Sequence, residues 1–177
     1  MLLLLGDGTR VPVTELPGAG PWTFLILLPG PTPADPGPAA AGTGFLARFG
    51  RVVVPDLRGR PGWGAPAGAP GFLDLVDDLD QVRTRAGLGR PLLVGLGDLA
   101  PLAVAAATDQ PWAWRALLLD PGAAGPGAAR LDRLDLPVLV LDADPGSAAG
   151  TAALERLLAR LGEGPGWAGI APDAPPR

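Results

Sequence analysis

The chain contains no histidine, cysteine, lysine, asparagine or tyrosine, and its single serine is Ser147. Without cysteine, it cannot form disulfides, thiolate nucleophiles or cysteine-based metal sites. Without histidine, it lacks the side chain that enzymes use most often as a general acid or base. These absences remove most catalytic chemistries before any motif is considered, and we expect neither a cofactor nor a bound metal ion.

Charge and hydrophobicity narrow the choice of partners. All 14 basic residues are arginines, and 18 acidic residues give a net charge of −4. No basic cluster is present to neutralise several phosphates, so we expect no nucleic-acid partner. The apolar runs fall far short of the roughly 20 residues that a membrane span needs, and the apolar start, residues 1–5, lacks the basic flank of a signal peptide. We expect a soluble cytoplasmic protein, with a small apolar ligand or another protein as the remaining partners and an unknown oligomeric state.

Glycine and proline are abundant, at 27 and 23 residues. Such numbers are typical of disorder in other contexts, but here these residues lie between periodic segments and mark turns of a folded chain. Two segments rich in glycine and proline, 31–38 and 61–71, are predicted to be mobile loops. A length of 177 residues is typical of one domain, and we expect residues 1–177 to form a single one.

Strand and helix patterns alternate along the chain. Asp7-Gly8 lies between the runs 2–5 and 10–16, which predicts an antiparallel hairpin. Continuous apolar runs, typical of strands covered on both faces, follow at 22–28, 51–54, 91–94, 115–119 and 137–141. Helical spacing of apolar residues occurs at 72–86, 99–107 and 154–161, and more weakly at 39–49. The pattern predicts an α/β fold: a doubly wound, mostly parallel sheet with an N-terminal antiparallel hairpin.

In such sheets, ligands bind beyond the carboxyl ends of the strands. The segments there resemble, in order, those of an α/β-hydrolase: Asp7–Val11, Leu27–Gly30, Val53–Gly59, Leu93–Gly95, Leu118–Pro121 and Leu136–Leu141. The sequence VVPDLRG following LLPG is the most specific part of this resemblance. The connection 120–136 is too short for the cap domain that many relatives insert there, so the chain resembles a capless, degenerate member of the superfamily.

The resemblance implies a nucleophile in the middle of a Gly-x-Ser-x-Gly elbow. The matching stretch runs from Gly95 to Leu99, and Gly97 occupies the serine position. Asp98 would be the nucleophile only if the elbow were shifted by one residue. The acid of the triad corresponds to Asp144 or Asp142, and no histidine is present for it to orient.

The family's ligand pocket is implied to lie between two strand ends. It corresponds here to Pro29, Gly30, Pro31, Gly97, Asp98 and Leu99. Pro31 has no N–H group with which to stabilise an oxyanion. The missing serine, histidine and N–H together predict a catalytically inactive pseudo-hydrolase with a binding or accessory role. The alternative is a weak or atypical hydrolase of esters or halides that uses Asp98 and Asp144.

Two other interpretations of the elbow remain open. Gly95-x-Gly97-x-x-Ala100, with Asp120 about 20 residues further on, has the spacing of a dinucleotide site. A purely structural interpretation gives the glycines to a tight turn and makes Asp98 the N-cap of the next helix.

Other polar and aromatic residues have structural interpretations. Asp56 and Arg58 are expected to form a surface ion pair. The aspartates of the helix 72–86 are expected to form a solvated face; they are Asp74, Asp77, Asp78 and Asp80. Trp112 and Trp114 are expected to pack inside the protein, which leaves Trp63 as the aromatic residue most suited to contact a partner.

Overall fold

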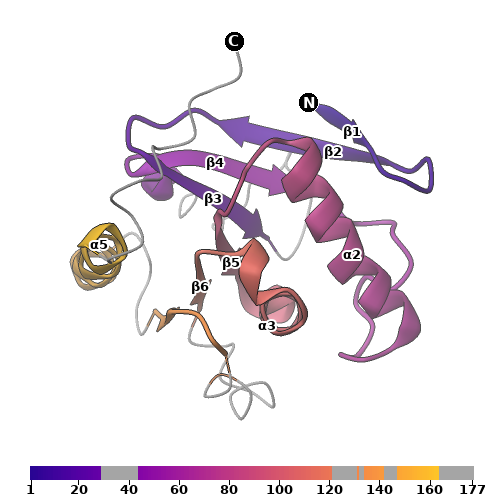
Figure 1. Ribbon diagram of the computed structural model, residues 1–177. Coiled ribbons are helices and arrows are strands. Elements are labelled where there is room, and N and C mark those ends of the chain that lie inside the picture. The colour runs from indigo at the N-terminus through magenta and orange to yellow at the C-terminus, as the bar shows by residue number, and fades with distance from the viewer. Residues whose placement is uncertain (29–43, 121–130, 132–133, 142–146, 164–177) are drawn as a thin grey trace.

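The computed structural model describes residues 1–28, 44–120, 131, 134–141 and 147–163. Its described strands form one seven-stranded sheet in the order β1-β2-β4-β3-β5-β6-β7 (Figure 1). The pairs from β4 through β7 are parallel, whereas β1 pairs with β2 and β2 pairs with β4 in antiparallel orientation. The predicted α/β class, with a mostly parallel sheet and an N-terminal hairpin, is confirmed.

Each predicted strand is present, and no strand end differs from its predicted position by more than one residue. The strands are β1 (Leu2–Leu4), β2 (Arg10–Leu16), β3 (Trp22–Leu27), β4 (Gly50–Pro55), β5 (Leu92–Gly95), β6 (Ala116–Leu119) and β7 (Val138–Val140). The turn between β1 and β2 uses Gly8 at φ +84°, a conformation that costs glycine little. The predicted hairpin is therefore formed as its Asp-Gly signal indicates.

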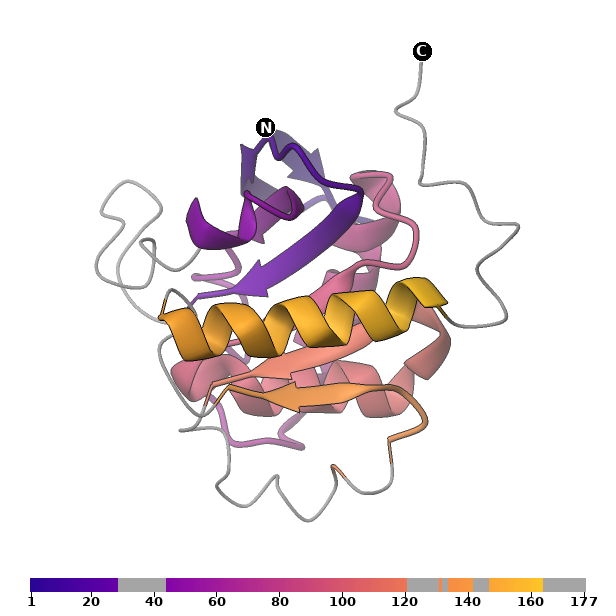
Figure 2. The ribbon, with the colours of Figure 1, turned by 90° about the vertical axis from the view of Figure 1, so that its left-hand side faces the viewer.

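Helices cover both faces of the sheet. They are α2 (Pro70–Arg85), α3 (Ala100–Asp109) and α5 (Ala148–Glu163), and two 3₁₀ turns, η1 (Gly97–Leu99) and η2 (Pro111–Ala113), flank α3. Figure 2 shows α5, in yellow, lying across one face of the sheet while α3 lies behind it. Among the described residues, every helix is too short or too polar to span a bilayer.

The core is divided between the two faces because side chains alternate along each strand. In β3, Leu25 and Leu27 belong to the cluster beneath α2 and α3, while Phe24 and Ile26 belong to the cluster beneath α5. All four residues are at most 1% exposed. A strand buried on both faces needs a continuous apolar run, which is why these strands are readable from the sequence.

Two expectations about side chains on the helices and loops are wrong. Asp78 is 2% exposed rather than solvated, because Arg60 reaches it from the loop before α2. Trp112 is 67% exposed, whereas Trp114 is fully buried as predicted. Trp63 is partly buried and packs against the core beneath α2.

The remaining segment predictions are resolved in part. Residues 70 and 71, placed in a loop by the sequence, form the first turn of α2. The weak helix at 39–49 has residues 44–46 in helical conformation. Its first residues and the loop 31–38 lie outside the described residues.

Candidate functional site

The order of the strands defines where the site should lie. The chain leaves β3 toward β4 on one side, and it leaves β5 toward β6 on the other. Because β3 and β5 are neighbours, their carboxyl ends form the topological switch point, where open α/β sheets bind ligands. Gly97 begins the turn η1 two residues after β5 ends at Gly95, so it lies directly at this point.

The two glycines of the turn serve different purposes. A Cβ atom on Gly95 would lie 2.5 Å from the Cβ atom of Ala103 and 3.0 Å from the Cα atom of Ala100. Gly95 therefore allows α3 to pack closely against β5. Gly97 has φ +53°, in the left-handed region that costs other residues roughly 1–2 kcal/mol.

Asp98 adopts neither of its two predicted conformations. No described residue other than glycine has a positive φ, so the left-handed position of the turn lies at Gly97 and not at Asp98. Nor is Asp98 an N-cap: it lies inside η1, and neither η1 nor α3 receives a capping hydrogen bond from a side chain. The Asp98 side chain is exposed to solvent.

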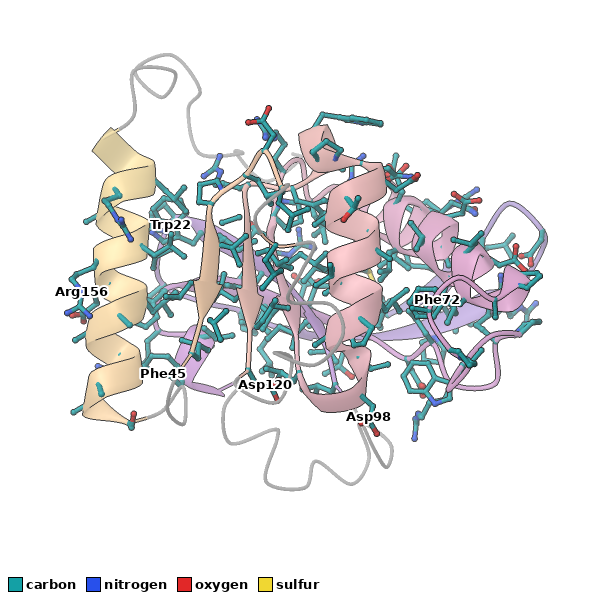
Figure 3. The ribbon with its side chains drawn as sticks, turned by 90° about the horizontal axis from the view of Figure 1, so that it is seen from below. Trp22, Phe45, Phe72, Asp98, Asp120 and Arg156 are labelled. Carbon is teal, nitrogen blue, oxygen red and sulfur yellow. The ribbon has the colours of Figure 1, made fainter. Side chains whose placement is uncertain are left out.

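Asp120 contacts the turn from the neighbouring strand. Its Oδ2 atom accepts a hydrogen bond from the Gly97 amide at 2.7 Å, and its own amide donates to the Gly95 carbonyl at 3.4 Å. Its Oδ1 atom is buried and accepts no hydrogen bond from the residues that the structure describes. Figure 3 shows Asp120 and Asp98 at the same end of the sheet, at the end of β6 and the start of the helical segment respectively.

Comparisons with known proteins identify the fold. No family model and no curated protein matches the chain. An N-formylmaleamic acid deformylase from Pseudomonas putida matches 68% of this chain and 45% of its own, with 25% identity and a TM-score of 0.52. A hydrolase from Pseudomonas aeruginosa matches 68% of this chain and 44% of its own, with 24% identity and a TM-score of 0.54. An esterase from Exiguobacterium antarcticum matches 67% of this chain and 44% of its own, with 20% identity and a TM-score of 0.51.

The chain has the α/β-hydrolase fold. It spans less than half the length of each of these structures.

Within the α/β-hydrolase fold, the structure describes only part of the predicted site. Gly95, Gly97 and Ala100 lie at one turn, and Asp120 joins them from the adjacent strand β6. Leu99 is buried at the end of η1. The other predicted members, Pro29, Gly30, Pro31, Asp142 and Asp144, lie outside the described residues.

The predicted ion pair after β4 is present at the same end of the α/β-hydrolase sheet. Arg58 Nε donates to Asp56 Oδ1 at 2.7 Å, and a second contact joins Arg58 Nη2 to Asp56 Oδ2. Hydrogen bonds from the Arg58 side chain hold the pKa of Asp56 below its usual value, against the opposing effect of partial burial. The charges of Asp56 and Arg58 therefore balance each other.

Sequence reasoning missed a second ion network near this end of the α/β-hydrolase fold. Arg60 donates to Asp78 Oδ2 from Nε at 2.6 Å and to Asp78 Oδ1 from Nη2 at 2.7 Å. Its Nη1 atom also donates to Asp7 Oδ2 at 2.9 Å and contacts the Thr9 hydroxyl. The network ties the loop after β4 to α2 and to the first hairpin. The only sequence signal was the position of Asp78 in the helix. It lies three residues after Leu75 and four before Val82, so helical spacing places it beside the apolar face.

Proposed function

We propose that this domain is a catalytically inactive protein of the α/β-hydrolase fold that acts as a binding or accessory module. The observation that carries the proposal is the residue at the nucleophile position. Gly97 has the left-handed conformation at the turn after β5 and has no side chain that could attack a substrate.

The sequence encodes neither a histidine nor a second serine that could replace the missing groups. None of its 177 residues is histidine, so no imidazole is encoded to deprotonate a nucleophile or to activate water. Its only serine, Ser147, accepts a hydrogen bond from the Gly150 amide at 3.1 Å at the start of α5. That contact supports a capping role for the serine.

The competing enzyme hypothesis assigns the nucleophile to Asp98. A nucleophile on an elbow is presented by a strained, left-handed turn residue, and Asp98 has an ordinary backbone conformation. This geometry favours the inactive domain over an Asp98-dependent hydrolase of esters or halides.

An assay of turnover tests the proposal. The purified protein is incubated with chromogenic carboxylic esters and short haloalkanes, alongside the variants Asp98→Ala and Asp109→Ala. Asp109 is a matched control because it is an exposed aspartate at the other end of α3. We expect the buffer rate in all three cases. Multiple turnovers by the wild type that Asp98→Ala abolishes and Asp109→Ala retains would overturn the proposal.

Dinucleotide binding is a second candidate, because β5 and β6 are adjacent and bring Asp120 beside the glycine turn. In a dinucleotide site, the acid at the end of the second strand binds a ribose hydroxyl. Here Asp120 Oδ2 already accepts the Gly97 amide, which leaves only Oδ1 for a ligand. Thermal stabilisation by a dinucleotide that is lost in Gly97→Val would support this function, since a ligand that binds only the folded state raises its stability.

A further inference from the structure

The strand β1 forms one edge of the sheet, and no other described strand lies along its outer side (Figure 1). An edge strand presents unpaired N–H and C=O groups that can bind a further strand. Native proteins commonly protect such an edge with a charged residue, a proline or a bulge. β1 has none of these protections, since it consists of three leucines that pair with β2 in one unbroken register. Its outer side is therefore suited to pairing with another strand.

The hydrogen bonds between β1 and β2 show which backbone groups of β1 point outward. The Val13 amide donates to the Met1 carbonyl, and the Leu5 amide donates to the Thr9 carbonyl, both at 2.8 Å. Residues that exchange hydrogen bonds with a neighbouring antiparallel strand alternate with residues that do not. The backbone groups of the odd-numbered residues thus point toward β2, and those of the even-numbered residues point to the outer side.

Leu2 and Leu4 carry the outward backbone groups of the strand. Their N–H and C=O groups find no partner in β2, because both residues occupy positions of the ladder without hydrogen bonds. The next outward amide, that of Gly6, donates to Gln81 Oε1 of α2 at 2.6 Å. Gln81 therefore closes the edge after β1 and limits its unpaired part to these two leucines.

The exposed face of β1 is also apolar. Leu2 and Leu4 are 57% and 54% exposed, and Met1 beside them is 53% exposed. They are three of the five large hydrophobic side chains that are exposed among the described residues, the others being Leu73 and Trp112. Exposed apolar side chains that gather in one place mark an interaction site more often than scattered ones do. Here they gather at the edge that lacks a strand partner.

We propose that β1 pairs with the β1 strand of a second copy of this chain, in antiparallel orientation about a twofold axis between the two Leu3 residues. The edge is self-complementary in this register. Leu2 of one copy lies opposite Leu4 of the other, and each of these two pairs exchanges two N–H···O=C bonds. A twofold interface uses the same surface on both subunits, so this one edge supplies both halves. The inference goes beyond the proposed function, because it holds whether or not the domain is an enzyme.

The charged side chains of the hairpin permit this pairing. Asp7 pairs with Arg60, and Glu15 pairs with Arg51. Arg10 lies on β2, so both β1 strands separate its two copies by roughly 14 Å, at about 4.8 Å per strand. This separation exceeds the Debye length of about 8 Å in physiological salt. No like charges of the hairpin therefore oppose each other across the shared edge.

Sedimentation velocity from micromolar to millimolar concentration tests the pairing. Stable interfaces bury roughly 1,200–2,000 Å², more than three residues of each copy can cover, so we expect a weak and reversible dimer. The variant Leu4→Lys places a charge on the edge. Leu73→Lys is its matched control, because Leu73 is also 54% exposed and lies on α2. Association should weaken at least about tenfold in Leu4→Lys and stay within about twofold in Leu73→Lys, since an edge charge opposes further pairing.

A charge swap and amide exchange test the register. Leu2→Lys with Leu4→Lys places like charges opposite each other, whereas Leu2→Lys with Leu4→Glu places opposite charges there. We expect the first double variant to remain monomeric and the second to associate. In the wild type, exchange of the Leu2 and Leu4 amides should slow as the concentration rises. Exchange of the Leu3 amide, which already faces β2, should stay unchanged.

The possible results separate this pairing from other contacts. A wild type that stays monomeric at millimolar concentration would overturn the proposal and would favour an unrelated strand as the partner of the edge. Equal losses in Leu4→Lys and Leu73→Lys would also overturn it, as would association without slower exchange of the Leu2 and Leu4 amides. If Leu4→Lys fails to fold, Leu2→Lys makes the same test on the opposite residue of the pair.

Discussion

Replacing Asp78 by asparagine should destabilise the protein far more than the same replacement at Asp80. Both aspartates lie on α2 and both bind an arginine. Asp78 receives two donors from Arg60, and the side chains of this pair are 4% and 12% exposed. The Asp80 and Arg83 side chains are 35% and 19% exposed and belong to neighbouring turns of one helix. The two substitutions therefore remove the same charge from a buried and from a partly exposed pair.

The expected magnitudes follow from this difference in burial. Breaking a buried ion pair by removing one partner costs about 3–5 kcal/mol. Arg60 keeps its contacts with Asp7 and Thr9. We therefore expect Asp78→Asn to cost about 3 kcal/mol, the lower end of this range. A pair with the exposure of Asp80 and Arg83 contributes about 0.5 kcal/mol.

Urea denaturation measures both values, and thermal unfolding provides an independent check. With about 2–4 °C per kcal/mol for a domain of this size, Asp78→Asn should lower Tm by about 6–12 °C. The double variant with Arg60→Gln should cost little more than either single change, because neighbours in one network are coupled. Losses of free energy within about 0.5 kcal/mol of each other for Asp78→Asn and Asp80→Asn would refute the reasoning.

Three further predictions concern the elbow, the buried tryptophan and the first turn. Gly95→Ala should cost about 1–3 kcal/mol by overpacking, since its methyl group would lie 2.5 Å from that of Ala103, and Ala103→Gly should restore part of the loss in chemical denaturation. Trp114→Ala should cost about 3–5 kcal/mol, whereas Trp112→Ala, at a side chain 67% exposed, should stay within about 0.5 kcal/mol; equal losses would contradict the assigned burial. The Thr9 amide and the Arg60 side chain lower the pKa of Asp7 to about 2. The contribution of Asp7 to stability should therefore be complete above pH 4 and lost as the pH falls through 2. An NMR titration of the Asp7 carboxyl group measures this pKa.

The strands and the switch point could be predicted from the sequence because their signals are local. A continuous apolar run such as 22–28 indicates a strand covered on both faces, and the carboxyl ends of parallel strands meet at one edge of the sheet. This logic placed Gly97 and Asp120 correctly near each other. The hydrogen bond between them was not predicted, because it depends on the register in which Gly95 pairs with Leu119.

The missed residues depend on contacts between segments far apart in the chain. Asp78 has the polarity of a solvated residue, and only Arg60, 18 positions earlier, explains its burial. Trp112 and Trp114 are the same residue type and are separated by a single alanine, but the turn η2 leaves Trp112 exposed and buries Trp114. The helical spacing places Asp78 beside apolar residues, but no pattern in the sequence identifies Arg60 as its partner or shows which of the two tryptophans is buried.

The turn after β5 shows why a glycine motif alone does not identify a ligand. Gly95 is required by the close packing of α3, and Gly97 by a left-handed backbone. Both requirements come from joining a strand to a helix within two residues, so they would persist in a hydrolase, a nucleotide-binding protein or an inactive domain. Asp120 is different, because the turn uses only one of its oxygens. The second oxygen accepts no hydrogen bond from the described residues, so Asp120 is the part of this site that the joining of strand and helix does not fully explain.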